Sequence, residues 1–339
     1  MVMQKKLKIL CLMIVLVLTL AGCAGKQEDV NETVPGVVTE NVLSTEVIET
    51  DESETESMET ESVSESDVEA ENKKSYTPWK ITQYGPLDAQ MSYYTIYNKD
   101  AGLILVDGGW ADCADHVRNT IKTFGGHVDA WIITHPHADH VGAFNAIYPN
   151  LDGITIGNIY TVDMATPEEC LEVASWDDMS SYEEFLALEV EGLQYLYPGD
   201  ELDISGLKLE VLSAYDENVQ GLSRDYLNDG SMMFKIYGEE ESFLFCADVG
   251  ISMSDHLLAK YGEEKLASTY LQMGHHGFGG LADNFYQAVK PKAAFFDAPD
   301  WLMKDETGKY DTPENVALME SMGSRIYGFS SAPNSIILK

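Results

Sequence analysis

Three histidines and one carboxylate occur within six residues, in the segment His135-Pro136-His137-Ala138-Asp139-His140. Imidazole and carboxylate groups are the ligands that proteins offer to zinc, manganese and iron. The proline keeps the residue before it extended, and alternate residues of an extended segment share one face. We therefore expect His135, His137 and Asp139 to converge, with His140 directed to a second position. A pair of adjacent metal ions accounts for this set better than the alternative, a solvated histidine-rich loop.

The elements that must position these ligands can be predicted from the surrounding pattern. The apolar run at residues 130–134 indicates a buried strand, so the ligands follow a strand end. Residues 91–97 and 102–106 predict a β-hairpin, and residues 112–124 predict a helix stopped by two glycines. The segments Thr166-Pro167-Glu168-Glu169 and Ser181-Tyr182-Glu183-Glu184 have the pattern of helix capping boxes. Further strands are predicted at residues 154–162, 207–212, 232–237 and 243–247, and further helices at residues 254–261 and 284–289.

The six-residue motif resembles the signature of the metallo-β-lactamase fold superfamily, and other motifs follow in that family's order. Residues 103–109 place Asp107 at the end of a predicted strand. Downstream, Asn228-Asp229-Gly230-Ser231 opens a strand, Asp248 ends one, and Gly274-His275-His276-Gly277 follows. This order is similar to the branch that includes the extracellular domain of competence channel proteins and the teichoic acid phosphorylcholine esterases. The resemblance covers residues 76–339 and implies an α/β fold, the four-layer αββα sandwich.

The resemblance also implies a ligand set and two divalent metal ions, zinc or manganese. His135 and His137 are assigned to the first metal, Asp248 to a bridging position, and the second metal to Asp139, His140 and His276. His275 is then free to hydrogen-bond the attacked oxyanion or phosphate, although the two neighbouring histidines could exchange roles or serve only in packing. Asp139 is also expected to hold or deprotonate the attacking water. Asp107 is expected to orient a ligand, the alternative being a turn aspartate before two glycines.

The sequence departs from the family pattern at three places. Many members carry a further histidine ligand, but no histidine lies between His140 and Asp248 here. Asn228 or Asp229 could supply the missing contact. Phe278 stands where serine is usual after the histidine pair, and Ala247 stands where glycine usually precedes the late aspartate.

The N-terminal region has a different character. Residues 1–22 combine three lysines with a short apolar stretch, which is typical of a signal peptide, and the sequence Leu20-Ala21-Gly22-Cys23 resembles a bacterial lipobox. We expect Cys23 to be lipidated and the protein to be anchored at the extracytoplasmic face of the cell membrane, the alternative being an ordinary cleaved signal. Residues 23–75 are rich in Glu, Ser and Thr and predict a disordered acidic stalk before the domain at residues 76–339.

Charge and cysteine content restrict the function classes. The formal net charge is −36, and residues 76–339 stay strongly acidic without the stalk, which disfavours nucleic acid as a partner. Beyond Cys11 and Cys23, the remaining Cys113, Cys170 and Cys246 are odd in number and have no metal-binding spacing. We interpret these three as buried thiols.

These observations favour a lipid-anchored metallohydrolase that cleaves a phosphoester or phosphodiester by metal-bound hydroxide. The substrate would be a small molecule or a cell-envelope polymer, and the membrane would be contacted only through the lipid anchor. Two alternatives stay open: a carboxylic ester or lactone hydrolase, and a binding lipoprotein with weak catalysis, which the missing histidine favours. The sequence does not indicate the oligomeric state.

Overall fold

The computed structural model describes residues 78–339. The predicted signal peptide, the lipidation site Cys23 and the stalk at residues 23–75 lie outside the described residues, so they stay predictions. Within the described part, no helix is both long and apolar enough to cross a bilayer.

Two seven-stranded sheets form the centre of this domain. The first has the order β14-β1-β2-β3-β4-β5-β6, and the second has the order β13-β12-β11-β10-β9-β8-β7. The first sheet contains β1 (Trp79–Gln83), β2 (Tyr93–Asn98), β3 (Gly102–Asp107), β4 (His127–Ile132), β5 (Thr155–Val162), β6 (Leu193–Leu196) and β14 (Asn334–Leu338). The second contains β7 (Glu201–Ile204), β8 (Leu207–Ser213), β9 (Met233–Tyr237), β10 (Ser242–Phe245), β11 (Tyr270–Gln272), β12 (Ala293–Phe295) and β13 (Arg325–Tyr327).

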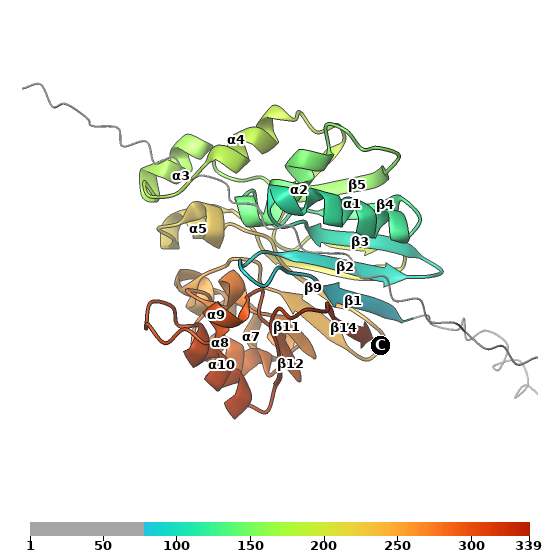
Figure 1. Ribbon diagram of the computed structural model, residues 1–339. Helices are drawn as coiled ribbons and strands as arrows, with labels where there is room; N and C mark the ends of the chain where they lie inside the picture. Colours follow the sequence, from blue (N-terminus) through green and yellow to red (C-terminus); the bar gives the residue numbers. More distant parts are fainter. Residues whose placement is uncertain (1–77) are drawn as a thin grey trace, which may run out of the picture. The chain divides into compact units, whose positions relative to one another are not determined.

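Helices flank both sheets (Figure 1). Those that precede β9 in the chain are α1 (Ala114–Thr123), α2 (Ala138–Ile147), α3 (Pro167–Val173), α4 (Ser180–Ala187), α5 (Glu217–Leu222) and α6 (Tyr226–Asp229). Those that follow β10 are α7 (Ser254–Leu266), α8 (Asp283–Val289), α9 (Asp300–Met303) and α10 (Thr312–Ser321). Two sheets between two helical layers make the αββα sandwich, so the predicted fold class is confirmed.

Strand β4 illustrates why the strands are apolar on both faces. Ala130 and Ile132 face the core between the sheets, together with Phe234 and Phe245 of the second sheet. Trp131 faces the opposite way, into the layer that contains residues of α1 and α2. Side chains alternate across a strand, so a strand covered on both sides must be apolar at successive positions.

Most of the predicted elements that frame the motif are confirmed. The hairpin forms between β2 and β3, with Asn98 opposite Gly102. The helix expected over residues 112–124 appears as a short 3₁₀ turn followed by α1. Thr166 and Glu169 form the reciprocal capping box at the start of α3.

Three local predictions are wrong. Ser181 does not cap a helix, because α4 begins at Ser180, whose backbone N–H donates to Asp178, and Ser181 is buried in the first turn. The segment Asn228–Ser231 does not open a strand directly: Asp225 caps the short helix α6 through the backbone N–H of Asn228. Cys170 and Cys246 are buried free thiols, as expected, but Cys113 is only half-buried.

Candidate metal centre

The predicted ligands follow the ends of parallel strands in both sheets. Strands β3 and β4 are parallel in the first sheet, and β10, β11 and β12 are parallel in the second. Asp107 ends β3, His135 follows β4, Asp248 follows β10, and His275 and His276 follow β11. Carboxyl ends of parallel strands form one edge of a sheet, and ligand sites in such folds gather at that edge. This topology brings together residues that are up to 169 positions apart in the chain.

The six-residue motif spans a loop and the first turn of α2. His137 has extended backbone geometry, with φ −68° and ψ 152°, and the helix begins at Ala138. Asp139 and His140 therefore lie on the first turn of α2 and not on an extended strand as expected. The extended segment ends at His137 because Pro136 constrains only the residues beside it. Asp139 and His140 still face the same centre, because the first turn of α2 directs both side chains toward it.

Four residues, Asp139, His140, Asp248 and His276, form a compact group at this centre. The Nε2 of His276 lies 3.2 Å from Oδ2 of Asp139 and 3.4 Å from Oδ2 of Asp248. The Nε2 of His140 lies 3.3 Å from Oδ1 of Asp248 and 3.4 Å from Nε2 of His276. A tetrahedral zinc ion with ordinary bond lengths separates its ligands by about 3.4 Å. The spacing of this group therefore fits a metal ion with little movement of the side chains.

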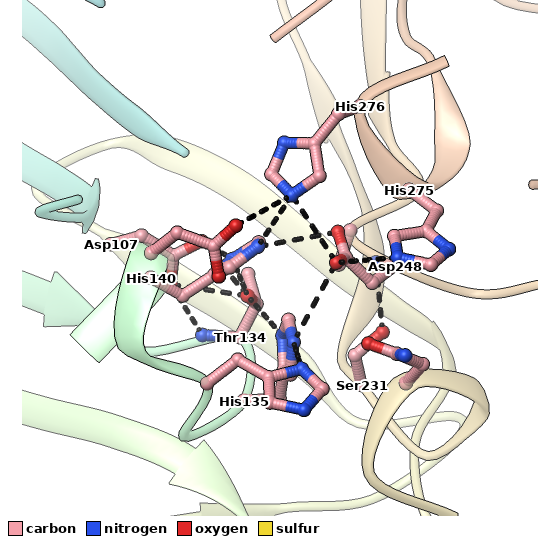
Figure 2. Close-up of polar contacts among 12 residues, drawn as sticks. Asp107, Thr134, His135, His140, Ser231, Asp248, His275 and His276 are labelled. Atoms are coloured by element: carbon pink, nitrogen blue, oxygen red, sulfur yellow. Dashed lines mark hydrogen bonds and ion pairs between the residues drawn. The ribbon is translucent and has the colours of Figure 1, made fainter. Parts of the chain in front are cut away.

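His135 and His137 form a second, adjoining group. The Nε2 of His135 lies 2.9 Å from Nδ1 of His137 and 3.8 Å from Oδ2 of Asp248. Figure 2 shows Asp248 at the centre, with contacts to His135, His140, His275 and His276. Asp248 therefore faces both groups, which is the arrangement that a bridging carboxylate requires. His135 also combines with His140 and Asp248 as a possible three-ligand set.

Asp107, itself hydrogen-bonded to Thr134, fixes the orientation of His140 through the ring nitrogen Nδ1. Oδ2 of Asp107 lies 2.8 Å from Nδ1 of His140, and the backbone N–H of Thr134 donates to Oδ1 of Asp107 over 2.8 Å. A carboxylate on one ring nitrogen fixes the orientation of the imidazole and leaves the other nitrogen free to ligate. Asp107 thus occupies the place that the orienting role requires, although its backbone is left-handed, with φ 55°.

Sequence reasoning missed one residue of the site, Asp177. Its Oδ2 lies 3.0 Å from Nε2 of His137, the ring nitrogen that faces away from His135. Asp177 belongs to the loop between α3 and α4, and the neighbouring Trp176 is 73% exposed. The only signal in the sequence was a pair of aspartates after a tryptophan, which is common in surface loops.

The histidine pair after β11 adopts an unusual backbone. His275 and His276 both have positive φ, 48° and 57°, which few non-glycine residues adopt. His276 is buried in the compact group, whereas the side chain of His275 is 25% exposed, and its Nε2 lies 3.8 Å from Oδ2 of Asp248. The geometry therefore favours His276 as the ligand and leaves His275 partly exposed beside Asp248.

Asn228 and Asp229 are outside both ligand groups. The carboxylate of Asp229 accepts hydrogen bonds from Ser223, Ser252 and the backbone of Gly250. These donors occupy both of its oxygens, so Asp229 stabilises the loop after Asp248. It is therefore not placed to replace the missing histidine. Asn228 donates from Nδ2 to Asp225, and its buried Oδ1 accepts no hydrogen bond from the described residues.

The electrostatics of the site favour a cation. Burial opposes charge on Asp139, but the hydrogen bond and charge of His276 lower its pKa to about 2. Burial likewise opposes charge on Asp248, yet the surrounding histidines, His140 first, lower its pKa well below the usual range. Burial and the neighbouring His140 lower the pKa of His135, which keeps that imidazole neutral. Burial opposes charge on His276 too, but Asp248 and Asp139 raise its pKa to about 10. Without a metal, the cluster therefore holds a proton where a divalent cation would bind, and metal binding would release that proton.

A buried carboxylate oxygen is consistent with this conclusion. Oδ1 of Asp248 is fully buried and accepts no hydrogen bond within residues 78–339, and its contact at 3.3 Å is Nε2 of the proposed ligand His140. Buried carboxylate oxygens without a donor are costly unless a cation binds them. The residues present therefore fit a divalent metal, and Asp139, His140, Asp248 and His276 are the ones that would hold it.

A family model described as the metallo-beta-lactamase superfamily matches residues 87–294, which include all the ligands described above. No curated protein matches the sequence of this chain.

Several solved structures are similar to this chain. The metallo-β-lactamase fold protein YhfI from Bacillus subtilis is 13% identical, over 77% of this chain and 100% of YhfI, with a TM-score of 0.47. CmlA, a diiron β-hydroxylase from Streptomyces venezuelae, is 13% identical over 77% of this chain and 54% of CmlA, with a TM-score of 0.48. A diphosphatase from the PhnP family is 12% identical over 77% of this chain and 98% of its own, with a TM-score of 0.45. The family assignment rests on the sequence match.

Proposed function

Because the chain belongs to the metallo-β-lactamase superfamily, whose members bind divalent metals and include hydrolases, we propose that it is a metal-dependent hydrolase of phosphoesters or phosphodiesters. We propose two metal positions, one in the compact group and one at His135 and His137, with Asp248 between them. Zinc and manganese both suit this mixture of imidazole and carboxylate ligands.

The observation that carries the proposal is the arrangement of Asp248 among four histidines. Divalent ions bound there would activate a water molecule and neutralise negative charge on a phosphoryl group. Among the proposed ligands His140, Asp248 and His276 are nearly inaccessible, whereas the ligand Asp139 and the neighbouring His275 are partly exposed. His275 can donate a hydrogen bond to a phosphoryl oxygen, and Asp139 can orient the attacking water.

We also propose that the protein acts at the outer face of the membrane, held by a lipid on Cys23. The lipobox-like sequence at residues 20–23 and the acidic stalk support this location. A cell-envelope phosphoester or a small phosphorylated molecule would be within reach of a domain on such a stalk.

A binding lipoprotein with weak catalysis is the second candidate. It is favoured by the group around His135, which lacks a third histidine among the described residues. A metal position with few protein ligands can bind a ligand without activating water efficiently.

The two candidates differ in turnover. The full chain, purified in detergent and supplied with zinc or manganese, should hydrolyse bis-para-nitrophenyl phosphate, and a chelator should abolish this activity. Hydrolysis of para-nitrophenyl acetate or a lactone, with no phosphodiester turnover, would support an ester hydrolase instead. Tight metal binding with no turnover on any of these substrates would support the binding protein.

A further inference from the structure

The residue before Asp248 is held in a conformation that its side chain disfavours. Ala247 has φ 46°, in the left-handed region, where a Cβ clashes with the backbone and glycine is the usual occupant. Cys246, Ala247 and Asp248 form the turn that leaves β10, so the backbone of Ala247 sets the direction of the Asp248 carboxylate. Other contacts must therefore stabilise this turn, which would otherwise relax to a more favourable backbone conformation.

Gln272 makes the contacts that hold the turn. It ends β11 and is 1% exposed. Its Oε1 accepts from the backbone N–H groups of both Cys246 and Ala247, each over 2.8 Å. The carbonyl of Ala247 accepts in turn from the backbone N–H of His275 over 2.8 Å. One glutamine therefore joins the turn that carries Asp248 to the turn that carries the histidine pair.

The amide of Gln272 is itself fixed by its other end. Its Nε2 donates to the carbonyl of Met273 over 2.8 Å and to Oδ2 of Asp297 over 3.1 Å. Asp297 is fully buried, and its Oδ1 accepts from Nε2 of Gln83 over 2.7 Å and from the hydroxyl of Tyr94 over 2.5 Å. Gln83 and Tyr94 belong to the first sheet, so Asp297 links the two sheets through Oδ1. Its other oxygen, Oδ2, fixes the orientation of the Gln272 amide, and Tyr94 alone can keep Asp297 in place.

We infer that Gln272 is a positioning residue that aims Asp248 at the metal centre. It holds the left-handed turn at Ala247, so the carboxylate faces His140 and His276 before a metal binds. The inference rests on the proposed metal-dependent function, and it names a residue outside the ligand set. Ligands that are already ordered bind a metal more tightly, because metal binding then costs less side-chain conformational entropy.

A matched pair of buried glutamines tests this role. Gln272→Met removes the acceptor for Cys246 and Ala247, whereas Gln83→Met removes a donor to the same Asp297 without touching the turn. Zinc affinity would be measured on the full chain in detergent, by competition with a chromophoric chelator, together with the Tm of the metal-free protein. We expect Gln272→Met to weaken zinc binding 10- to 100-fold. Gln83→Met should lower the Tm but leave zinc affinity within about threefold of the unmodified chain.

A rescue experiment separates positioning from general stability. Glycine adopts the left-handed conformation without strain, so Ala247→Gly in the Gln272→Met background should recover at least tenfold in zinc affinity. Ala247→Gly alone should bind zinc at least as tightly as the unmodified chain. If Gln272→Met does not fold, Gln272→Asn, whose shorter side chain cannot reach both amides, takes its place in the same comparison.

The outcomes are distinguishable. Unchanged zinc affinity in Gln272→Met would overturn the inference, as would equal losses in the Gln272 and Gln83 variants. Absence of rescue by Ala247→Gly would also overturn it, because the strain at Ala247 would then not be what Gln272 offsets. An unmodified chain that binds no zinc or manganese would instead contradict the proposed function itself.

Discussion

The Nε2 of His137 lies 3.0 Å from Oδ2 of Asp177, a residue 40 positions later in the chain. A proton on Nε2 would be shared with Asp177, and Nδ1, which contacts Nε2 of His135 here, would then be the nitrogen that binds a metal. The group around His135 has few protein ligands. A carboxylate beside Nε2 makes the imidazole of His137 more basic, which strengthens metal binding at this group.

Asp177→Asn should therefore weaken the metal bound at His135 and His137 by 10- to 100-fold. Asp178→Asn is the matched control, because Asp178 is exposed and its carboxylate accepts from the backbone and side chain of Ser180, with no hydrogen bond to His137 among the described residues. Metal affinities of the two variants, measured at equilibrium, should differ by at least tenfold. Equal affinities would show that Asp177 has no influence on the ligand beside it.

Metal loss should occur in two steps. Four ligand atoms converge in the compact group, whereas two histidines and Asp248 converge at His135, so the second position should release its ion first. Titration with a chelator, with metal content and phosphodiester turnover followed together, should show activity falling with the weaker ion. Zinc or manganese should restore it. Simultaneous release of two equally tight ions would contradict the asymmetry between the groups.

The stability of the protein should depend on pH through Asp297. Burial raises the pKa of this carboxyl to about 6 from an ordinary value of 3.8. The folded state therefore binds the proton more tightly than the unfolded state, and this contribution to stability is lost as the pH rises from about 4 to about 6. A shift of about two pKa units corresponds to about 3 kcal/mol.

Asp297→Asn removes this dependence. Relative to the unmodified chain, the free energy of unfolding of Asp297→Asn should rise by about 3 kcal/mol between pH 4 and pH 7. Urea unfolding in the presence of a chelator, at several pH values, measures the difference without a contribution from metal binding. A constant difference across this range would mean that Asp297 is ionised at both ends of it.

Membrane attachment should depend on Cys23. Cys23→Ser should move the protein from the membrane fraction to the soluble fraction or the medium, because the lipid would no longer be attached. The Tm of the domain at residues 76–339 should not change. A Cys23→Ser protein that stays firmly in the membrane fraction would refute the lipid anchor.

The sequence predicted the fold because the main signals were local. The run at residues 130–134, the hairpin and the Thr166 capping box each depend on neighbouring residues, and each is found in the structure. The proposed ligand residues could likewise be predicted, because three histidines and an aspartate within six residues are typical of a metal site.

The supporting residues could not be predicted in this way. Asp177 reaches His137 across 40 positions, and Gln272 and Asp297 are joined only when two sheets pack together. The substitution of Ala247 for the usual glycine was visible in the sequence, but its partner Gln272 was not. The Ser181 prediction failed for a related reason: Asp178 already bonds the helix N-terminus, which begins one residue earlier.

Asp248 gives the most direct test of the central claim, that this cluster of histidines and carboxylates is a metal centre. Asp248→Ala would be compared with Cys246→Ser, a change two residues earlier at a fully buried thiol outside the cluster. Metal content of the purified full chains, by mass spectrometry, should be close to two ions for the unmodified chain and for Cys246→Ser. It should fall to one ion or fewer in Asp248→Ala, with loss of phosphodiester turnover. Unchanged metal content and turnover in Asp248→Ala would contradict the account.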